Sequence, residues 1–523
     1  MSCSPGRTHP PAPLRVVIVG GGTAGWMCAA GLARLLPPTD YALTLIESDE
    51  IGTVGVGEAT LPHIREFNAM LGLDEAEFMR ATQGSFKLGI EFVGWDKPGG
   101  RYVHPFGSFG ERWGGIDFQH HWLRARAAGQ DVGDWFDHSF AVAMCREGVF
   151  DLPDEDLRSI RSTFSYAYHF DAGLYAEYLR RWATPRGVRR IEGKIVDIAR
   201  NAESGLVESV ALQSGAAIAG DLFIDCSGFR SLLLGQSMGV AWHDWSAWLP
   251  CDRAMAVPCA GAAGITPFTR STAQAGGWTW RIPLQHRTGN GYVFSSSFCS
   301  EEQARETILG AIDGAPLADP RLLRFQAGRR ARGWEGNVVA IGLSSGFLEP
   351  LESTSIFLIQ AAVTDLANLM PLPGGGPPDP RLAAEFNRLF AIHYDRTRDF
   401  LVLHYTANAR HGEPLWDHVR NMALPDSLAH KIALFRSSGR APDYKLGLFS
   451  RDSWLAVLMG QGILPEAHDR LADRAPLDEV ADRLAELRER IATNAAALPA
   501  HAEFIASYCS AARGTADDRA VTA

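Results

Sequence analysis

The sequence predicts an α/β fold, because two buried strands flank a glycine-rich turn and a helix near its N-terminus. The run Leu14–Val19 (LRVVIV) is continuously aliphatic, which is typical of a strand buried on both faces. Helix-forming residues follow over Ala24–Leu36 and end at Pro37 and Pro38. A second short strand is predicted over Tyr41–Ile46 (YALTLI). Together these segments form a βαβ unit, the building block of parallel sheets.

Glycines stand where the first strand meets the helix. In a G-x-G-x-x-G turn, Gly20 permits the sharp turn, Gly22 lets the backbone approach a pyrophosphate, and Gly25 lets helix and strand pack closely. The phosphates then lie on the free N–H groups of the helix N-terminus. Glu47 ends the second strand and is placed to accept hydrogen bonds from ribose hydroxyls. The pattern predicts a Rossmann-like dinucleotide site and does not by itself choose between FAD and NAD. The residues assigned to this site are Gly20, Gly22, Thr23, Ala24, Gly25 and Glu47.

Further strands are predicted along the chain. Ser85–Phe92 (SFKLGIEF) alternates with period two, which predicts one strand with its apolar side chains on one face and Lys87 on the other. Leu206–Leu212, Asp221–Ile224 and Asn337–Leu343 are the other candidates. The alternation alone favours an ordinary surface position for Lys87.

The C-terminal part changes character after Pro371–Pro380 (PLPGGGPPDP), which predicts a linker or surface loop. Beyond it the pattern is mostly helical. One amphipathic stripe has the spacing 3, 4, 3, 4 and stops at Pro499. Since only about two heptads are present, we expect this helix to dock on the protein's own body instead of forming a coiled coil. The stripe consists of Leu477, Val480, Leu484, Leu487 and Ile491.

Composition excludes several classes of protein. With 523 residues, 46% hydrophobic and 21% charged, the chain can bury a large core and is not a disordered protein. Its 50 basic and 60 acidic residues give a net charge of −10, which argues against nucleic acid or an anionic membrane as a partner. The cysteines are scattered without a C-x-x-C pair, so we expect no metal site and a cytoplasmic location. Neither a signal peptide nor a membrane-spanning run is expected.

Beside the glycine turn and Lys87, two further segments stand out, Gly277–Pro283 (GWTWRIP) and Glu349–Thr354 (EPLEST). Together these motifs resemble those of flavin-dependent halogenases of the tryptophan-halogenase type. The turn Asp221–Gly228 (DLFIDCSG) resembles the second flavin-contacting motif of two-dinucleotide-domain flavoproteins, and no second glycine fingerprint for a nicotinamide cofactor is present. The resemblance runs from about Leu14 to about Gly462. It also includes Gly55–Thr60 (GVGEAT), His104–Gly107 (HPFG) and Tyr168–Asp171 (YHFD).

The resemblance implies an α/β (α+β) fold with a FAD-binding, Rossmann-like, two-dinucleotide-domain core and a mostly helical substrate-binding module. We expect residues 14–370 to form the discontinuous FAD-binding module, with substrate-side insertions around 95–165, and residues 371–509 to form the helical module. Residues 1–13 and 510–523 are small and polar and predict a disordered leader and tail. Length alone would allow several domains, but the interrupted flavin module favours one continuous body.

The resemblance also implies the reaction. FAD used as FADH2, together with O2 and chloride or bromide, yields hypohalous acid, which crosses a tunnel to Lys87, while Glu352 assists at the aromatic substrate. For a haloamine, burial would have to lower the pKa of Lys87. Two backbone amides, at Thr354 and Ser355, would hold the halide. Many tryptophan halogenases have glycine where this chain has Ser355, so its halide preference is open. Further flavin contacts would be Asp225, Gly228, Gly342 and Leu351, and substrate contacts His104, Phe106 and Trp454.

Other points stay open at the level of sequence. Trp278 and Trp280 are either core aromatics or residues that obstruct monooxygenase-type access near the flavin. The segment 410–452 contains only Tyr444 and no tyrosine pair for an amino-acid backbone, which favours an indole-like substrate over free L-tryptophan. The alternatives are an L-tryptophan halogenase, an NAD(P)H-dependent flavin hydroxylase and a non-catalytic flavin-binding module. As partners we expect a separate NAD(P)H-dependent flavin reductase and a small aromatic substrate; a homodimer is open.

Overall fold

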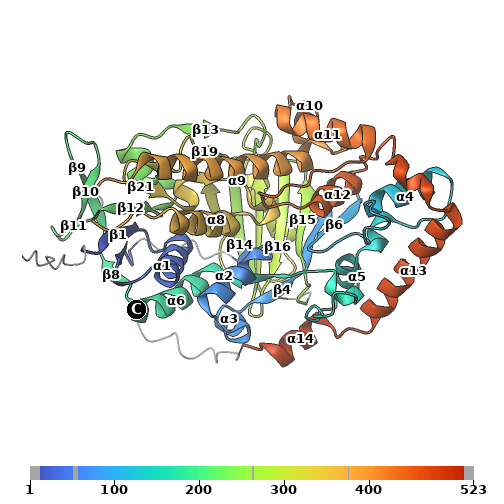
Figure 1. Cartoon of the computed structure of the whole chain (residues 1–523), viewed down its shortest axis with the longest axis horizontal. Helices are drawn as coiled ribbons and strands as arrows, with labels where there is room; N and C mark the ends of the chain where they lie inside the picture. The colour runs from blue at the N-terminus through green and yellow to red at the C-terminus, as the bar shows by residue number, and fades with distance from the viewer. Residues whose placement is uncertain (1–11, 51–56, 262–263, 375, 512–523) are drawn as a thin grey trace, which may run out of the picture.

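A computed structural model describes residues 12–50, 57–261, 264–374 and 376–511 (Figure 1). It confirms the βαβ unit as β1 (Leu14–Val19), α1 (Thr23–Leu35) and β2 (Tyr41–Glu47). β1 pairs in parallel with β2, register Leu14 to Tyr41, and with β12 (Leu222–Asp225). The predicted leader falls almost wholly, and the predicted tail largely, outside the described residues, as do Gly55 and Val56 of the GVGEAT motif.

The parallel sheet has the strand order β20-β21-β12-β1-β2-β8, and its edge strand β20 is antiparallel. The side chains of β1 alternate between two hydrophobic clusters, so the strand is buried on both faces as its composition predicts. β21 is shorter than the predicted Asn337–Leu343, because the chain turns at Gly342 into a 3-10 helix. The other strands of the sheet are β8 (Arg189–Glu192), β20 (Trp334–Glu335) and β21 (Val338–Ala340).

A seven-stranded mixed sheet lies beside it, near the centre of the molecule (Figure 1), in the order β18-β14-β17-β16-β15-β5-β6. Its core is a set of adjacent antiparallel strands, and β15 joins β5 in parallel. The bounds are β18 (Arg321–Arg324), β14 (Arg253–Cys259), β17 (Thr288–Phe294), β16 (Gly277–Pro283), β15 (Thr269–Gln274), β5 (Gly89–Val93) and β6 (Arg101–Pro105). Smaller sheets are formed by β9 (Ile195–Arg200), β10 (Val207–Leu212) and β11 (Ala217–Ala219), and by β13 (Trp242–Asp244), β19 (Gly328–Arg330) and β22 (Gly346–Phe347).

The predicted single strand Ser85–Phe92 is wrong in one respect: it is two strands in two sheets. β4 (Ser85–Lys87) pairs with β7 (Ala167–Asp171) next to β3 (Gly57–Ala59), whereas β5 belongs to the large sheet. Leu88 joins them, with its N–H donating to Pro267 O and its carbonyl accepting from Phe106 N, both at 2.7 Å. Because the chain passes between two sheets there, both faces of β4 are covered, and Lys87 is buried together with its apolar neighbours.

In residues 380–508 every regular element of the described chain is helical. α9 (Pro380–Thr406) is the longest of these and runs along the top of the molecule in Figure 1, over both large sheets. α13 (Leu477–Ala496) buries Val480, Leu484 and Ile491 and packs on α4 (Phe118–Ala127) and α5 (Phe140–Glu147), which confirms that the amphipathic stripe docks on the protein's own body. The remaining helices of this part are α10 (Pro414–Asn421), α11 (Asp426–Ser438), α12 (Arg451–Gly460) and α14 (His501–Tyr508).

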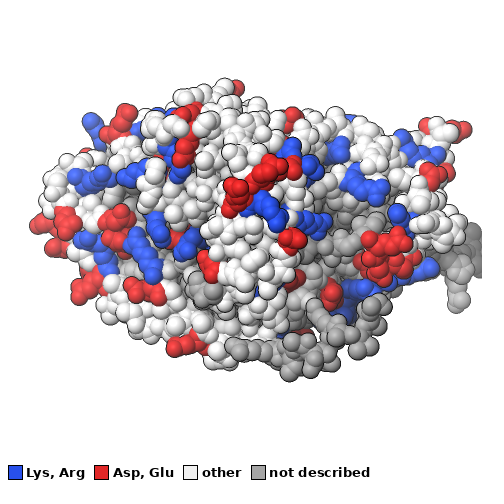
Figure 2. Space-filling model, turned by 180° about the vertical axis from the view of Figure 1, so that it is seen from behind, with Lys and Arg blue, Asp and Glu red and all other residues white. Residues whose placement is uncertain are grey.

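The principal hydrophobic core is continuous, since one cluster contains Trp26 of α1, Phe92 of β5, Phe400 of α9 and Ile491 of α13. Lys, Arg, Asp and Glu side chains are interspersed over the rear face (Figure 2). In the described ranges no helix combines the length and apolar character that a membrane crossing needs. No group of His, Cys, Asp and Glu side chains in the same ranges is arranged to hold a metal ion.

Candidate active site

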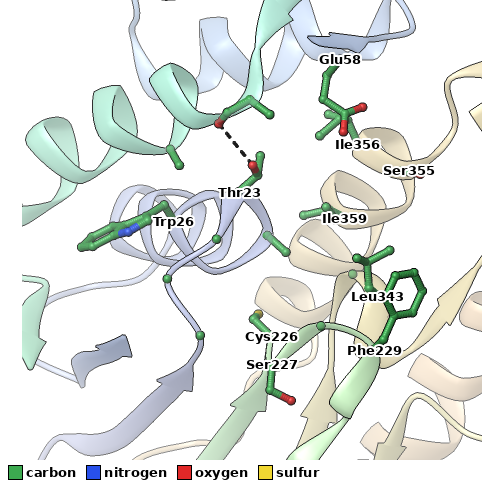
Figure 3. Close-up of a pocket in the computed structure, with 18 of the residues that line it drawn as sticks. Thr23, Trp26, Glu58, Cys226, Ser227, Phe229, Leu343, Ser355, Ile356 and Ile359 are labelled. Carbon is green, nitrogen blue, oxygen red and sulfur yellow. Dashed lines mark hydrogen bonds between the residues drawn. The ribbon is translucent and has the colours of Figure 1, made fainter. Parts of the chain in front are cut away.

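A cavity of about 640 Å³ opens at the carboxyl ends of β1, β2 and β12 (Figure 3). This is where ligands bind in doubly wound α/β folds. In Figure 3 the N-terminus of α1, the turn after β12 and α8 (Ser355–Asn368) surround it. Several residues predicted from the sequence line the cavity, namely Gly20, Gly22, Thr23, Ala24, Glu47, Gly228, Gly342 and Ser355.

The glycine turn is closely packed, as the motif requires. Gly20 has φ +111°, and a Cβ there would lie 2.3 Å from Cys226 O. A Cβ on Gly25 would lie 1.8 Å from Gly20 O, and one on Gly21 would lie 1.6 Å from Glu47 Oε2. Gly25 therefore serves helix packing and does not line the cavity. The cradle leaves room for a pyrophosphate at the helix N-terminus, so these residues fit a dinucleotide.

Glu47 faces this cavity but is already engaged by protein groups. Its Oε2 accepts a hydrogen bond from Trp26 Nε1 at 3.1 Å, and Oε1 pairs with Arg190. Arg190 also contacts Asp49 and Glu192, at 2.7 and 2.8 Å. These contacts orient the carboxylate at the rim of the cavity.

Two predicted flavin contacts, Asp225 and Leu351, lie outside the cavity lining. Asp225 is fully buried and does not line the cavity, since its carboxylate accepts hydrogen bonds from the backbone N–H groups of Ser227, Leu233 and Leu234. It shapes the turn that presents Gly228. The Leu351 side chain is packed in the core behind the cavity wall. A sequence motif marks both positions but does not show which way each side chain points.

Lys87 is fully buried, with Nζ donating to Thr60 O at 2.9 Å and to Ser353 Oγ at 2.8 Å. The Phe106 ring centroid lies 5.1 Å from Nζ. Burial lowers the pKa of Lys87 to about 7, although the negative charge of Glu352 acts in the opposite direction. A neutral amine has two hydrogens, which match the two acceptors and leave its lone pair free.

Glu352 is fully buried between two histidines. His104 Nδ1 lies 2.8 Å from Oε2, and His404 Nε2 lies 2.7 Å from Oε1. Burial by itself would raise the pKa of Glu352, but the attraction of His104 and His404 outweighs it and lowers the pKa to about 2. His404 Nδ1 lies 2.8 Å from Phe400 O, which leaves Nε2 as the ring nitrogen that faces Glu352.

Ser353 connects this buried pair to the cavity. It lines the cavity wall, and its hydroxyl accepts the hydrogen bond from Lys87. Neither Lys87 nor Glu352 lines the cavity itself. The structure therefore places the buried Lys87–Glu352 pair next to the cavity, with Ser353 between the lysine and the cavity.

Aromatic side chains surround the lysine and glutamate. Phe400 lies 5.6 Å from His104 between ring centroids, stacks on Phe449 at 3.8 Å, and meets Trp454 edge-on at 5.1 Å. His104 thus lies beside Glu352 and Phe106 beside Lys87, whereas Trp454 contacts the Phe400 ring; their roles in substrate binding stay a prediction.

The two tryptophans of the GWTWRIP strand have different surroundings. Trp278 is fully buried and its Nε1 donates to Glu349 Oε2 at 2.9 Å. Trp280 is partly buried and lines the cavity. Trp278 is therefore a core residue, whereas Trp280 faces the cavity, and its obstruction of access near the flavin stays a prediction.

The predicted halide residues lie at the N-terminus of α8. Ser355 is the first residue of this helix and lines the cavity; Thr354 precedes it, fully buried and outside the cavity lining. In Figure 3 Glu58 points toward Ile356 and Ser355. Burial raises the pKa of Glu58 to about 7, so a carboxyl group that the sequence interpretation did not single out lies at this helix end.

Sequence reasoning missed four residues of this arrangement. Thr60, Glu58 and Ser353 stand inside motifs that were recognised, so their position was available but their contacts were not. His404 belongs to no motif and lies in the last turn of a long helix, where the sequence gives no signal of a functional position.

The fold and the site define a class: a dinucleotide-binding enzyme with a second, buried lysine–glutamate site next to its cofactor cavity. The sequence profile of the tryptophan halogenase family matches residues 15–477. The chain belongs to this family, whose members are flavin-dependent enzymes.

Individual relatives cover nearly the whole chain. Tryptophan 6-halogenase SttH from Streptomyces toxytricini is 36% identical over 95% of this chain and 98% of its own. Among solved structures, the flavin-dependent halogenase Xcc4156 from Xanthomonas campestris is 45% identical, with a TM-score of 0.91, over 96% of this chain and 99% of its own. BrvH, a flavin-dependent halogenase from Brevundimonas sp. BAL3, is 43% identical, with a TM-score of 0.91, over 96% and 100%.

Proposed function

We propose that this enzyme halogenates an electron-rich, indole-like aromatic substrate with chloride or bromide, using FADH2 and O2. The observation that carries the proposal is the buried Lys87–Glu352 pair, which adjoins the cofactor cavity through Ser353. FAD would be held by the glycine turn, Glu47, Gly228 and Gly342. Reduced FAD with O2 supplies the oxidising equivalents that turn halide into hypohalous acid. A separate flavin reductase would deliver the FADH2.

Lys87 would receive the oxidised halogen beside the cofactor cavity. With a pKa of about 7, a large fraction of the side chain is a neutral amine near neutral pH. Its lone pair can attack the halogen of hypohalous acid, forming an N–halogen bond and releasing water. A charged Lys87 could instead donate a hydrogen bond that polarises the acid. Both routes need Lys87 where the hydrogen bonds to Thr60 and Ser353 hold it.

Glu352 would accept the proton that the aromatic ring loses after the halogen is added. A pKa of about 2 keeps the carboxylate ionised throughout the physiological range. Its negative charge, fixed between His104 and His404, stabilises the positive charge that develops on the ring before proton loss. A cationic ring intermediate is acidic enough for such a weak base to deprotonate it.

For the halide we propose the N–H groups at the start of α8, at Thr354 and Ser355. The helix N-terminus carries partial positive charge, and Ser355 faces the cavity, which supports this position. Glu58 would have to be neutral while an anion is bound there, since two negative charges at one helix end repel each other.

We propose an indole-like substrate and not free L-tryptophan because Tyr444 is the single tyrosine of segment 410–452 and two cationic side chains lie over its ring. Its ring is covered by the Arg396 guanidinium, at 4.1 Å from the centroid, and by Lys431 at 5.5 Å. No second tyrosine of segment 410–452 is present to receive an amino-acid backbone. Several relatives carry names that specify tryptophan, SttH among them, so halogenation of the free amino acid is the second candidate. The cytoplasmic location also stays a prediction.

The test is a turnover assay with FADH2 from any reductase, O2, chloride or bromide, and a panel of indoles read by mass. We expect halogenated product from the wild type, and none from Lys87→Ala, which should still oxidise FADH2. Hydroxylated product from the wild type, or halogenation by the variant, would contradict the mechanism. Turnover of L-tryptophan at the rate of the best indole would contradict the substrate preference.

A further inference from the structure

A second buried glutamate lies three residues before Glu352, and the proposed mechanism does not use it. Glu349 is fully buried, and its Oε2 accepts hydrogen bonds from Trp278 Nε1 at 2.9 Å and from Tyr405 OH at 2.5 Å. Trp278 Nε1 also lies 3.0 Å from Tyr405 OH, so the three polar groups form a closed triangle. We call Trp278, Glu349 and Tyr405 the anchor cluster.

The anchor cluster does not line the cofactor cavity. Leu348 and Pro350, on either side of Glu349, line the cofactor cavity, whereas Glu349 does not. The rings of Trp95 and Trp416 lie on the Tyr405 side of the cluster, at centroid distances of 5.5 and 6.0 Å from Tyr405. A carboxyl group in such an apolar site is stabilised by its two donors. Burial raises the pKa of Glu349 to about 7 against the effect of these hydrogen bonds.

The cluster is linked to the active site through two neighbouring residues of α9. Tyr405 reaches Glu349, and the preceding residue, His404, reaches Glu352. The 3-10 helix Pro350–Glu352 is therefore attached to α9 at one acidic residue just before it and at another at its end. Two attachments prevent the short helix from turning about either one.

The segment that follows needs this support. Ser353 has φ +57°, a left-handed conformation that is unfavourable for a non-glycine residue and persists only when neighbouring contacts impose it. This conformation presents the hydroxyl to Lys87 Nζ. We propose that the anchor cluster is a positioning device, which holds the segment 350–353 so that Glu352 meets His404 and Ser353 meets Lys87.

The inference rests on the proposed function only where its test counts halogenated product. Trp278→Phe and Tyr405→Phe each remove one donor and keep an aromatic ring. The matched control is Trp416→Phe, because Trp416 is equally buried in the same aromatic group but donates to Gln274 O at 2.8 Å. We expect both anchor variants to form at least tenfold less product per FADH2 oxidised than the control, with FADH2 oxidation within twofold of wild type. Ratios equal to the control would overturn the proposal.

Glu349 itself offers a conservative rescue. Glu349→Gln keeps an accepting oxygen for Trp278 and Tyr405 and should retain product per FADH2 within threefold of wild type. Glu349→Met has a side chain of similar length without the accepting oxygen, and its product per FADH2 should be at least tenfold lower than that of wild type. If the product per FADH2 falls as far in Glu349→Gln as in Glu349→Met, the charge of Glu349 is needed and its hydrogen-bond acceptor is not sufficient, and the proposal fails. If Glu349→Met does not fold, the comparison of Trp278→Phe with Trp416→Phe decides alone.

Crystal structures of the variants provide a test that does not depend on turnover. In Trp278→Phe and Tyr405→Phe we expect Ser353 to leave its left-handed conformation or its contact with Lys87, and in Trp416→Phe to keep both. An unchanged Ser353 in all three would overturn the anchor role. A wild type that forms no halogenated product would instead contradict the proposed function, while this structural comparison would still decide the anchor role.

Discussion

Replacing Lys87 with methionine should stabilise the protein while it abolishes halogenation. Burial lowers the pKa of Lys87 from its ordinary value of 10.5 to about 7. One unit of pKa corresponds to about 1.4 kcal/mol, so the charged lysine is disfavoured in the folded state by about 5 kcal/mol. Lys87→Met also leaves Thr60 O without its donor, which costs about 1–3 kcal/mol. The expected net gain is therefore about 2–4 kcal/mol at pH 6.

The pH dependence of the stability difference shows whether the buried charge of Lys87 causes it. In the wild type the unfolded chain binds a proton at Lys87 that the folded protein lacks between pH 7 and 10.5, so stability from this group rises over that range. The advantage of Lys87→Met should be full below pH 7 and disappear as the pH approaches 10.5. Urea unfolding followed by tryptophan fluorescence measures it.

Lys431→Met is the matched control. Lys431 is also buried but lies 2.6 Å from Asp399, so its loss removes one of the two cations that pair with this buried carboxylate, the other being Arg398 at 2.7 Å, and should destabilise the protein. A Lys87→Met protein that is no more stable than wild type at pH 6, or whose advantage does not change up to pH 10, would refute the reasoning.

Three other predictions concern Glu352, Lys87 and the glycine turn of the cavity. Glu352→Gln should lower halogenated product at least about 100-fold while FADH2 oxidation continues, because an amide cannot take the ring proton; wild-type product formation would exclude Glu352 as the base. Product per FADH2 should rise from pH 6 to pH 8 as Lys87 (pKa about 7) becomes neutral, and a fall over this range would instead favour hydrogen-bond donation by the charged form. Gly20→Ala should prevent FAD binding in a fluorescence titration, since its Cβ would lie 2.3 Å from Cys226 O; Gly72→Ala, also at positive φ but with open space around it, should bind FAD normally.

Local pattern predicted the elements in which every residue is constrained by its near neighbours. The strand Leu14–Val19 and its glycine turn agree with the structure because a doubly buried strand and a close helix packing both leave a direct mark on residue type. The prediction for Ser85–Phe92 was wrong because alternation describes one sheet surface, and this segment passes from one sheet to another.

The site divides in the same way. Motifs identified Lys87 and Glu352, which lie in compact, recognisable segments. His404 and Tyr405 could not be identified from the sequence, because their partners lie about fifty residues earlier in the chain. The sequence of a helix does not show which residues of other segments contact it. Asp225 was identified by its motif, but only the folded turn shows that its carboxylate accepts hydrogen bonds from backbone N–H groups.

The sequence by itself determined that this protein is a dinucleotide-binding α/β enzyme with the motifs of a flavin-dependent halogenase. Only the tertiary structure decided which buried charges are paired. Lys87 has two neutral acceptors and a lowered pKa, Glu352 has two histidines and a lowered pKa, and Glu349 has two neutral donors and a raised one. The physical reason is that desolvation and hydrogen bonding depend on groups brought together from β4, the 3-10 helix and α9, which no single segment of the sequence contains.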